Sequence, residues 1–181
     1  GYTVGCGTVF QEISTLGHGE IFFQNCDKKN YFISSYYKYR PWRESYQLSR
    51  DHLKQKLVDV TMQSIKRVVE QASNRQIAVP LSAGRDSRLV VSALKHLGAE
   101  NVTCYSYGPR GNFEGEIAKR ICERLGFDWV FVEVTPKIQR KFWNTQIPEE
   151  FANQSNDFMA APVFHDLFVT DLLRKQRVIS E

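Results

Sequence analysis

Apolar residues recur along the middle of the chain at two different spacings, and the change between them predicts alternating helices and strands. From Ser49 to Ala72 they recur every three to five positions, with charged residues between them, which predicts an amphipathic helix. The run Ile77–Leu81 is instead continuous and mostly aliphatic, as is typical of a strand that is buried on both faces. A long helix is therefore expected to lead into a buried strand.

The same alternation continues toward the C-terminus. The pattern predicts two more helices and two more strands: helices over 88–97 and 114–125, and strands over 101–107 and 129–134. Gly98 and Gly126 follow the two helices and are expected to end them. Repeated strand–helix–strand units predict a parallel sheet with right-handed crossovers. The predicted fold class is therefore α/β, with a Rossmann-like parallel sheet and helices on both of its faces.

The first forty residues differ from this pattern, because they hold short β-prone runs separated by glycine and polar turn residues. The runs Thr8–Phe10, Glu20–Phe23 and Tyr31–Ile33 predict a small β meander. We therefore expect a β-rich part over residues 1–44 and the α/β domain over residues 45–181.

The C-terminal third is less regular. Residues 136–148 are expected to form a helix or a lid, and 162–173 a helix with Phe164, Leu167, Phe168 and Leu172 on one face. Asp166 stands beside His165 there, and we interpret the two as a helix-surface pair. Val178–Ser180 looks like the start of another strand.

Composition limits the class of protein. A chain of 181 residues with 42% hydrophobic residues is long enough to bury a core. Its net charge of +4 suits an anionic ligand but is too small to argue for nucleic acid. No apolar run reaches membrane-spanning length, and the four cysteines form no C-x-x-C pair. We therefore expect a cytoplasmic protein with reduced thiols and no membrane partner.

The segment between the first strand and the next helix is the candidate site. Residues Ser82–Ser87 are mostly small or polar, so backbone N–H groups and the positive end of a helix dipole are expected to face whatever lies in the turn. Phosphate suits that environment. The alternative is an ordinary turn in which Asp86 or Ser87 caps the helix. Tyr107 and Gly108 follow the second strand, at the same expected edge of the sheet.

Two motifs carry a resemblance to a known family. The segment Ser82-Ala-Gly-Arg-Asp-Ser87 resembles the Ser-Gly-Gly-x-Asp-Ser loop of the PP-loop ATP pyrophosphatases. Its surroundings resemble the asparagine synthase family, in which a Ser-x-Gly ends the next strand and an acidic residue, here Glu114, stands four positions before an alanine. Asn112 or Glu114 could instead cap that helix. Ala83 departs from the family glycine and would be strained if its φ were positive.

The resemblance implies a site for ATP and Mg²⁺. Ser82, Gly84, Asp86 and Ser87 would hold the β- and γ-phosphates, and Asp86 would also position Mg²⁺. Leu81 and Tyr107 match positions that contact the nucleoside. The full implied set is Leu81, Ser82, Ala83, Gly84, Arg85, Asp86, Ser87, Tyr107 and Gly108, with Arg88 as the next base along. No catalytic residue is assigned.

The activity that the resemblance implies is AMP-forming amide ligation, with a small-molecule carboxylate and an amine as substrates. Residues 1–44 resemble the tail of an amidotransferase-like domain, but the chain begins with Gly1 rather than a nucleophilic cysteine, so no glutaminase activity is expected. No second glycine- and acid-rich loop follows Val178–Ser180, so we expect 45–181 to be incomplete at its C-terminus. A PP-loop enzyme that modifies tRNA and a non-catalytic nucleotide-binding module are the alternatives.

Overall fold

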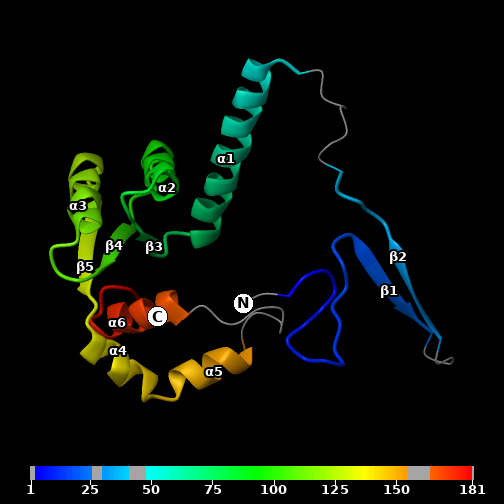
Figure 1. The fold of residues 1–181 in the computed structure, drawn as a ribbon. Helices are drawn as coiled ribbons and strands as arrows, with labels where there is room; N and C mark the ends of the chain where they lie inside the picture. The colour runs from blue at the N-terminus through cyan, green and yellow to red at the C-terminus, as the bar shows by residue number, and fades with distance from the viewer. Residues whose placement is uncertain (1–2, 26–29, 41–47, 155–163, 181) are drawn as a thin grey trace. The chain divides into compact units, whose positions relative to one another are not determined.

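The structure is a computed structural model that describes residues 3–25, 30–40, 48–154 and 164–180 (Figure 1). The chain divides into two compact units. The first unit comprises residues 1–47 and 146–163, and the second unit comprises 48–145 and 164–181. The boundary expected between residues 44 and 45 lies outside the described residues.

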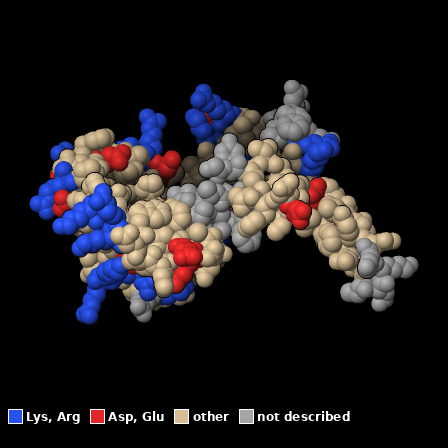
Figure 2. Space-filling view, turned by 60° about the horizontal axis from the view of Figure 1, so that its bottom comes forward, with Lys and Arg blue, Asp and Glu red and all other residues tan. Residues whose placement is uncertain are grey.

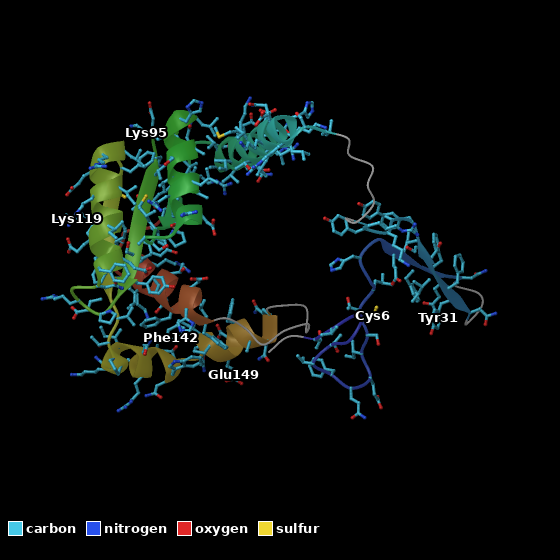
Figure 3. All side chains as sticks on the ribbon, turned by 45° about the horizontal axis from the view of Figure 1, so that its top comes forward. Cys6, Tyr31, Lys95, Lys119, Phe142 and Glu149 are labelled. Carbon is cyan, nitrogen blue, oxygen red and sulfur yellow. The ribbon has the colours of Figure 1, made fainter. Side chains whose placement is uncertain are left out.

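The first unit contains an antiparallel hairpin of β1 (Glu20–Gln24) and β2 (Tyr31–Ser35), with Phe22 opposite Ile33. Aromatic rings stack across it, Phe23 on Phe32 with ring centres 4.8 Å apart. The expected strand Thr8–Phe10 is absent. The Thr8 hydroxyl donates to the Ile13 carbonyl at 2.7 Å and accepts from the Phe10 N–H at 3.1 Å, which stabilises a turn there. Helix α5 (Ile147–Gln154) belongs to this unit as well, and Figure 3 labels its Glu149.

The second unit is built on a parallel sheet, in the order β3–β4–β5. Its strands are β3 (Ile77–Pro80), β4 (Val102–Gly108) and β5 (Asp128–Glu133). Val79 pairs with Cys104, and Cys104 with Trp129. The central strand β4 is the most buried, as expected of a strand with neighbours on both sides.

Helices cover both faces of this sheet, which confirms the predicted fold class. Helices α1 (Arg50–Ala72), α2 (Arg85–His96) and α3 (Phe113–Leu125) contribute to one core cluster together with Cys104 of β4. Consecutive strand residues face opposite sides, so Tyr105 faces the other way. There Asp166 of α6 (Phe164–Lys175) is close enough to influence the Tyr105 phenol, and α6 also packs on β5.

Aromatic contacts join α6 to the helix that follows the sheet, α4 (Pro136–Trp143). The ring of Phe142, labelled in Figure 3, lies edge-on to Phe168 with centres 5.2 Å apart. The buried face of α6 includes Val169 and Leu173 besides Phe168, whereas the pattern had favoured Leu167 and Leu172. Positions 162 and 163 of the expected helix lie outside the described residues.

Two boundaries differ from expectation. Helix α2 begins at Arg85 rather than at residue 88. Val178–Ser180 is not a strand: the chain turns at Arg177, whose φ is +56°, and the Gln76 amide then donates to the Val178 carbonyl and accepts from the Ser180 N–H. Gly98 and Gly126 do end their helices, with φ of +73° and +68°. In the part of the chain that the structure describes, no helix has the length and apolar character needed to cross a membrane.

Candidate functional site

The chain leaves the sheet directly after Leu81 and enters α2 within a few residues. The Leu81 N–H donates to the Tyr105 carbonyl at 2.8 Å, and Gly84 is already the N-cap of α2. Gly84 has no side chain, so no side-chain oxygen caps the first turn. Arg85, Asp86 and Ser87 form that turn rather than a loop. The N–H groups at such a helix start have no partner within the helix and are available to an anionic ligand.

Two hydroxyls hold the Ser82–Ser87 segment in shape. The Ser82 N–H donates to the Ser87 hydroxyl oxygen at 3.2 Å, and the Gly84 N–H donates to the Ser82 hydroxyl oxygen at 3.0 Å. The two hydroxyl oxygens are themselves 3.2 Å apart. Both backbone N–H groups therefore have a hydroxyl oxygen as acceptor within the segment, and a bound phosphate would have to replace that oxygen at each of them.

Charged side chains lie within the Ser82–Ser87 segment and directly after it. Arg88 donates from Nε to the Gly84 carbonyl at 3.0 Å, which holds its guanidinium beside the start of α2. Asp86 and Arg85 are exposed in the first turn. A carboxylate at a helix N-terminus interacts favourably with the helix dipole. The sequence alternative, in which Asp86 or Ser87 caps the helix, is wrong because both residues lie inside it.

Ala83 introduces no backbone strain. Among the described residues, the non-glycine residues with positive φ are Ser73, Asn74 and Arg177, so the alanine stands at a position that does not need glycine. Gly108 is different. Its φ is +143°, and a Cβ there would lie 2.7 Å from the Asn112 side-chain nitrogen. The end of β4 therefore requires glycine.

A cavity of about 240 Å³ opens at the carboxyl ends of β3 and β4. Of the predicted residues it brings together Leu81, Ser82 and Tyr107, and the rest of the Ser82–Ser87 segment follows Ser82 in the chain. Sequence reasoning had not assigned five of the lining residues to a nucleotide site: Pro80, Tyr105, Ser106, Glu114 and Gly115. Ser106 is the serine of the Ser-x-Gly that ends this strand, a motif that the sequence analysis used for the resemblance without giving the serine a role.

Glu114 remains available to this cavity because another residue caps α3. The Asn112 side-chain oxygen accepts from the Glu114 N–H at 2.8 Å, so Asn112 is the N-cap. Glu114 is one of the residues that line the cavity.

Burial raises the pKa of the Tyr107 phenol, and the neighbouring carboxylates of Asp166 and Glu114 raise it further. The pKa of Tyr105 is raised by burial first, and then by Asp166 and Tyr107. Both phenols are therefore neutral at neutral pH and can donate hydrogen bonds. His165 and Asp166 are both exposed on α6, as expected of a helix-surface pair, and the packing of α6 also brings Asp166 near the two phenols.

The family comparison agrees with this geometry. A family model described as Asparagine synthase matches residues 56–174. The chain belongs to the asparagine synthase family. The matched span runs from α1 to α6 and includes the Ser82–Ser87 segment and all residues that line the cavity. It is an ATP-using family of the PP-loop type, as the sequence motifs had indicated.

Other comparisons add less. Among curated proteins no sequence matches. Among solved structures, the chain is similar to NH3-dependent NAD synthetase from Campylobacter jejuni subsp. jejuni NCTC 11168, in complex with the nitrate ion. The two share 22% sequence identity with a TM-score of 0.40, and the match covers 69% of this chain and 49% of that chain. This chain thus spans about half the length of that protein.

The donor set of the site suits a metal that arrives with a nucleotide. In the described ranges, no group of three or more His, Cys, Asp or Glu side chains is placed to hold a metal ion. The Ser82–Ser87 segment offers one carboxylate, Asp86. Mg²⁺ commonly binds through one or two carboxylates together with substrate phosphates and water. Asp86 therefore fits Mg²⁺ held jointly with phosphate oxygens, not a permanent site formed by protein alone.

Positive charge lies on the same unit. On the face shown in Figure 2, Lys and Arg gather at the left of the view, over the second unit. Some positive charge of this unit is remote from the Ser82–Ser87 segment, since Lys95, labelled in Figure 3, is in the last turn of α2, at the opposite end of that helix from Asp86. A positive field of this kind favours an anionic ligand in general.

Proposed function

We propose that the second unit binds ATP with Mg²⁺ at the Ser82–Ser87 segment and serves in AMP-forming amide ligation. The observation that carries the proposal is the start of α2. There the Ser82 and Gly84 N–H groups point at oxygen acceptors, beside a cavity at the carboxyl edge of a parallel sheet. Membership of the asparagine synthase family supports the same ligand.

Each residue of the segment has a distinct proposed role. Ser82, Gly84, Asp86 and Ser87 hold the β- and γ-phosphates through N–H groups and hydroxyls, and the Ala83 and Arg85 backbone completes the turn around them. Asp86 shares Mg²⁺ with the phosphates. Arg88 adds positive charge at the same end of α2.

The nucleoside is proposed to lie in the cavity, against Leu81 and Tyr107. Gly108 has a φ of +143°, which residues with a side chain rarely adopt, and this allows the backbone after β4 to pass close to Asn112.

The reaction follows from holding these groups in place. A carboxylate oxygen of the substrate forms a bond to the α-phosphorus as the bond to pyrophosphate breaks, and pyrophosphate leaves with the electron pair. The amine nitrogen then bonds to the acyl carbon as the bond from that carbon to the bridging phosphate oxygen breaks. AMP leaves with this oxygen and the electron pair, and the amine loses a proton. The contribution of the protein is orientation and neutralisation of the charge on the phosphates.

The domain assignment is part of the proposal. We propose that residues 1–44 are the end of an amidotransferase-like domain and 45–181 a synthetase-like domain, acting in the cytoplasm on a small carboxylate and a small amine. The free thiols of Cys6, Cys104 and Cys122 are in keeping with a reducing compartment.

The test is a calorimetric titration of the whole chain with ATP–Mg²⁺, with GTP–Mg²⁺ alongside. We expect selective ATP binding that weakens about tenfold or more in Asp86→Ala, since tenfold corresponds to about 1.4 kcal/mol and a lost metal contact exceeds that. Asp51→Ala is the matched control, because Asp51 also lies exposed in the first turn of a helix. It should bind ATP as the unchanged chain does.

Two results would contradict the proposal: no binding at millimolar ATP, or equal binding by Asp86→Ala and Asp51→Ala. A screen for pyrophosphate release with mixed carboxylates and amines then separates a ligase from a nucleotide-binding module.

A further inference from the structure

The Ser106 hydroxyl makes two hydrogen bonds inside the second unit. It donates to the Leu81 carbonyl at 2.7 Å and accepts from the indole N–H of Trp129 at 3.0 Å. The directions are unambiguous, because a carbonyl only accepts and an indole N–H only donates. Ser106 is 5% exposed, so water is a poor substitute for either partner. One buried hydroxyl therefore links β4 to β5 and to Leu81, the residue that directly follows β3.

Leu81 is the last residue before the Ser82–Ser87 segment, and β4 holds both of its polar backbone groups. Its N–H donates to the Tyr105 carbonyl at 2.8 Å, and its carbonyl accepts from Ser106. The Leu81 carbonyl and the Ser82 N–H belong to one planar trans peptide group, so they point in opposite directions. Fixing the carbonyl on Ser106 therefore aims the Ser82 N–H away from β4. That N–H points at the Ser87 hydroxyl oxygen, the side on which we place phosphate.

Packing holds Trp129 in place on the far side of Ser106. Its ring lies 6.1 Å from that of Phe131, centre to centre. Both rings lie beneath Gly115 of α3, where an added Cβ would come within 3.0 Å of Phe131 and 3.8 Å of Trp129. A residue larger than glycine would press on the Phe131 ring, which packs against Trp129. The indole N–H is thus directed at Ser106 by the packing of α3 on β5.

We propose that Ser106 is a positioning residue for the nucleotide site, which orients the first N–H of the Ser82–Ser87 segment and is itself oriented by Trp129. The inference rests on the proposed function. It predicts a selective effect, because the oriented N–H meets phosphate while the nucleoside contacts Leu81 and Tyr107. Loss of the hydroxyl should weaken binding of pyrophosphate and ATP and leave binding of adenosine unchanged.

The experiment titrates the whole chain with pyrophosphate–Mg²⁺, ATP–Mg²⁺ and adenosine in separate runs. Ser106→Ala should weaken binding of pyrophosphate–Mg²⁺ and of ATP–Mg²⁺ about tenfold, and binding of adenosine less than about twofold. Ser106→Thr keeps the hydroxyl and should restore binding to within about twofold of the unchanged chain. Trp129→Phe keeps a ring but removes the N–H, and should weaken pyrophosphate binding about threefold.

Thr103→Val is the matched control. Thr103 is also a buried hydroxyl of β4, and it accepts from the Gln76 amide at 2.7 Å at the other end of the strand. This variant should bind all three ligands normally. Circular dichroism checks that each variant is folded, and Trp129→Phe decides the question if Ser106→Ala does not fold.

The outcomes separate the two proposals. If the unchanged chain binds ATP but Ser106→Ala keeps its pyrophosphate affinity, or loses adenosine and pyrophosphate equally, the positioning role is wrong and the proposed function stands. If the unchanged chain binds none of the ligands, both are overturned.

Discussion

The two sheets of this protein use similar residues in opposite surroundings. The hairpin β1–β2 carries Phe22, Phe23 and Phe32, yet every residue of β2 is exposed, and Phe32 is 61% exposed. Strand β4 carries Tyr105, which is 7% exposed, and residues 102–106 are all buried. A β-prone run thus indicates a strand but not the burial of its side chains. Burial comes from the neighbouring strands and the helices that cover them.

This difference matters for function. A binding loop is accurate only when the elements that carry it are rigid. In the second unit the Ser82–Ser87 segment runs from the end of β3 into the first turn of α2, and both elements contribute to the core cluster through Val79, Val91 and Leu94. Among the residues that the structure describes, the hairpin contributes none to that core cluster, and all of β2 is exposed.

The largest expected effect is on stability, and it comes from truncating one buried and one exposed side chain. Leu94→Ala should lower the free energy of unfolding by about 3 kcal/mol, because Leu94 is 1% exposed and its truncation leaves a cavity. Ile33→Ala in β2 should cost less than about 1 kcal/mol, since Ile33 is 51% exposed. Urea unfolding followed by circular dichroism measures both. Similar losses in the two variants would show that the hairpin is as well packed as the sheet.

A smaller effect is expected in thiol chemistry. Burial raises the pKa of the Cys104 and Cys122 thiols, whereas Cys6 of the first unit is exposed. The thiolate is the reactive form, so both buried thiols should react with an aromatic disulfide reagent at least about tenfold more slowly than Cys6 at pH 8. Peptide mapping by mass spectrometry assigns the rates. Equal rates at Cys6 and Cys104 would mean that the core opens readily.

The same thiols give a pH dependence. Their pKa is higher in the folded than in the unfolded state, so their stabilising contribution is complete below about pH 8.5, the ordinary thiol value. Above it the unfolded chain releases protons more readily, and stability falls as the pH rises through the folded pKa. The urea midpoint of the second unit should therefore decrease at alkaline pH, and less so in Cys104→Ala.

Much of the second unit could be predicted from the sequence, because the spacing of apolar residues along the chain indicates the order of its helices and strands. The strand at Ile77 and the helix ends at Gly98 and Gly126 depend on neighbouring residues only. The start of α2 was missed because Asp86 and Ser87 are themselves good caps, while the structure gives that place to Gly84.

The residues that sequence reasoning missed at the site share one property: their roles depend on distant partners. Ser106 contacts Leu81 across 25 positions of the chain, and Trp129 contacts Ser106 across 23. Asp166 acts on Tyr105 only through the packing of α6. No local pattern encodes such pairs. The predicted strand at Val178–Ser180 was wrong for a related reason. The Gln76 side chain makes the hydrogen bonds to Val178 and Ser180 that a neighbouring strand would have made.

The measurement that tests the central claim most directly is a nuclear magnetic resonance titration of the backbone amides with ATP–Mg²⁺. The account predicts that the largest shifts fall on Ser82, Gly84 and the first turn of α2, with smaller ones at Tyr107 and Gly108 and none in β1 or β2. The N–H groups there exchange the hydroxyl oxygens of Ser82 and Ser87 for phosphate oxygens. Saturating ATP that leaves these amides unmoved, or that shifts the hairpin instead, would contradict it.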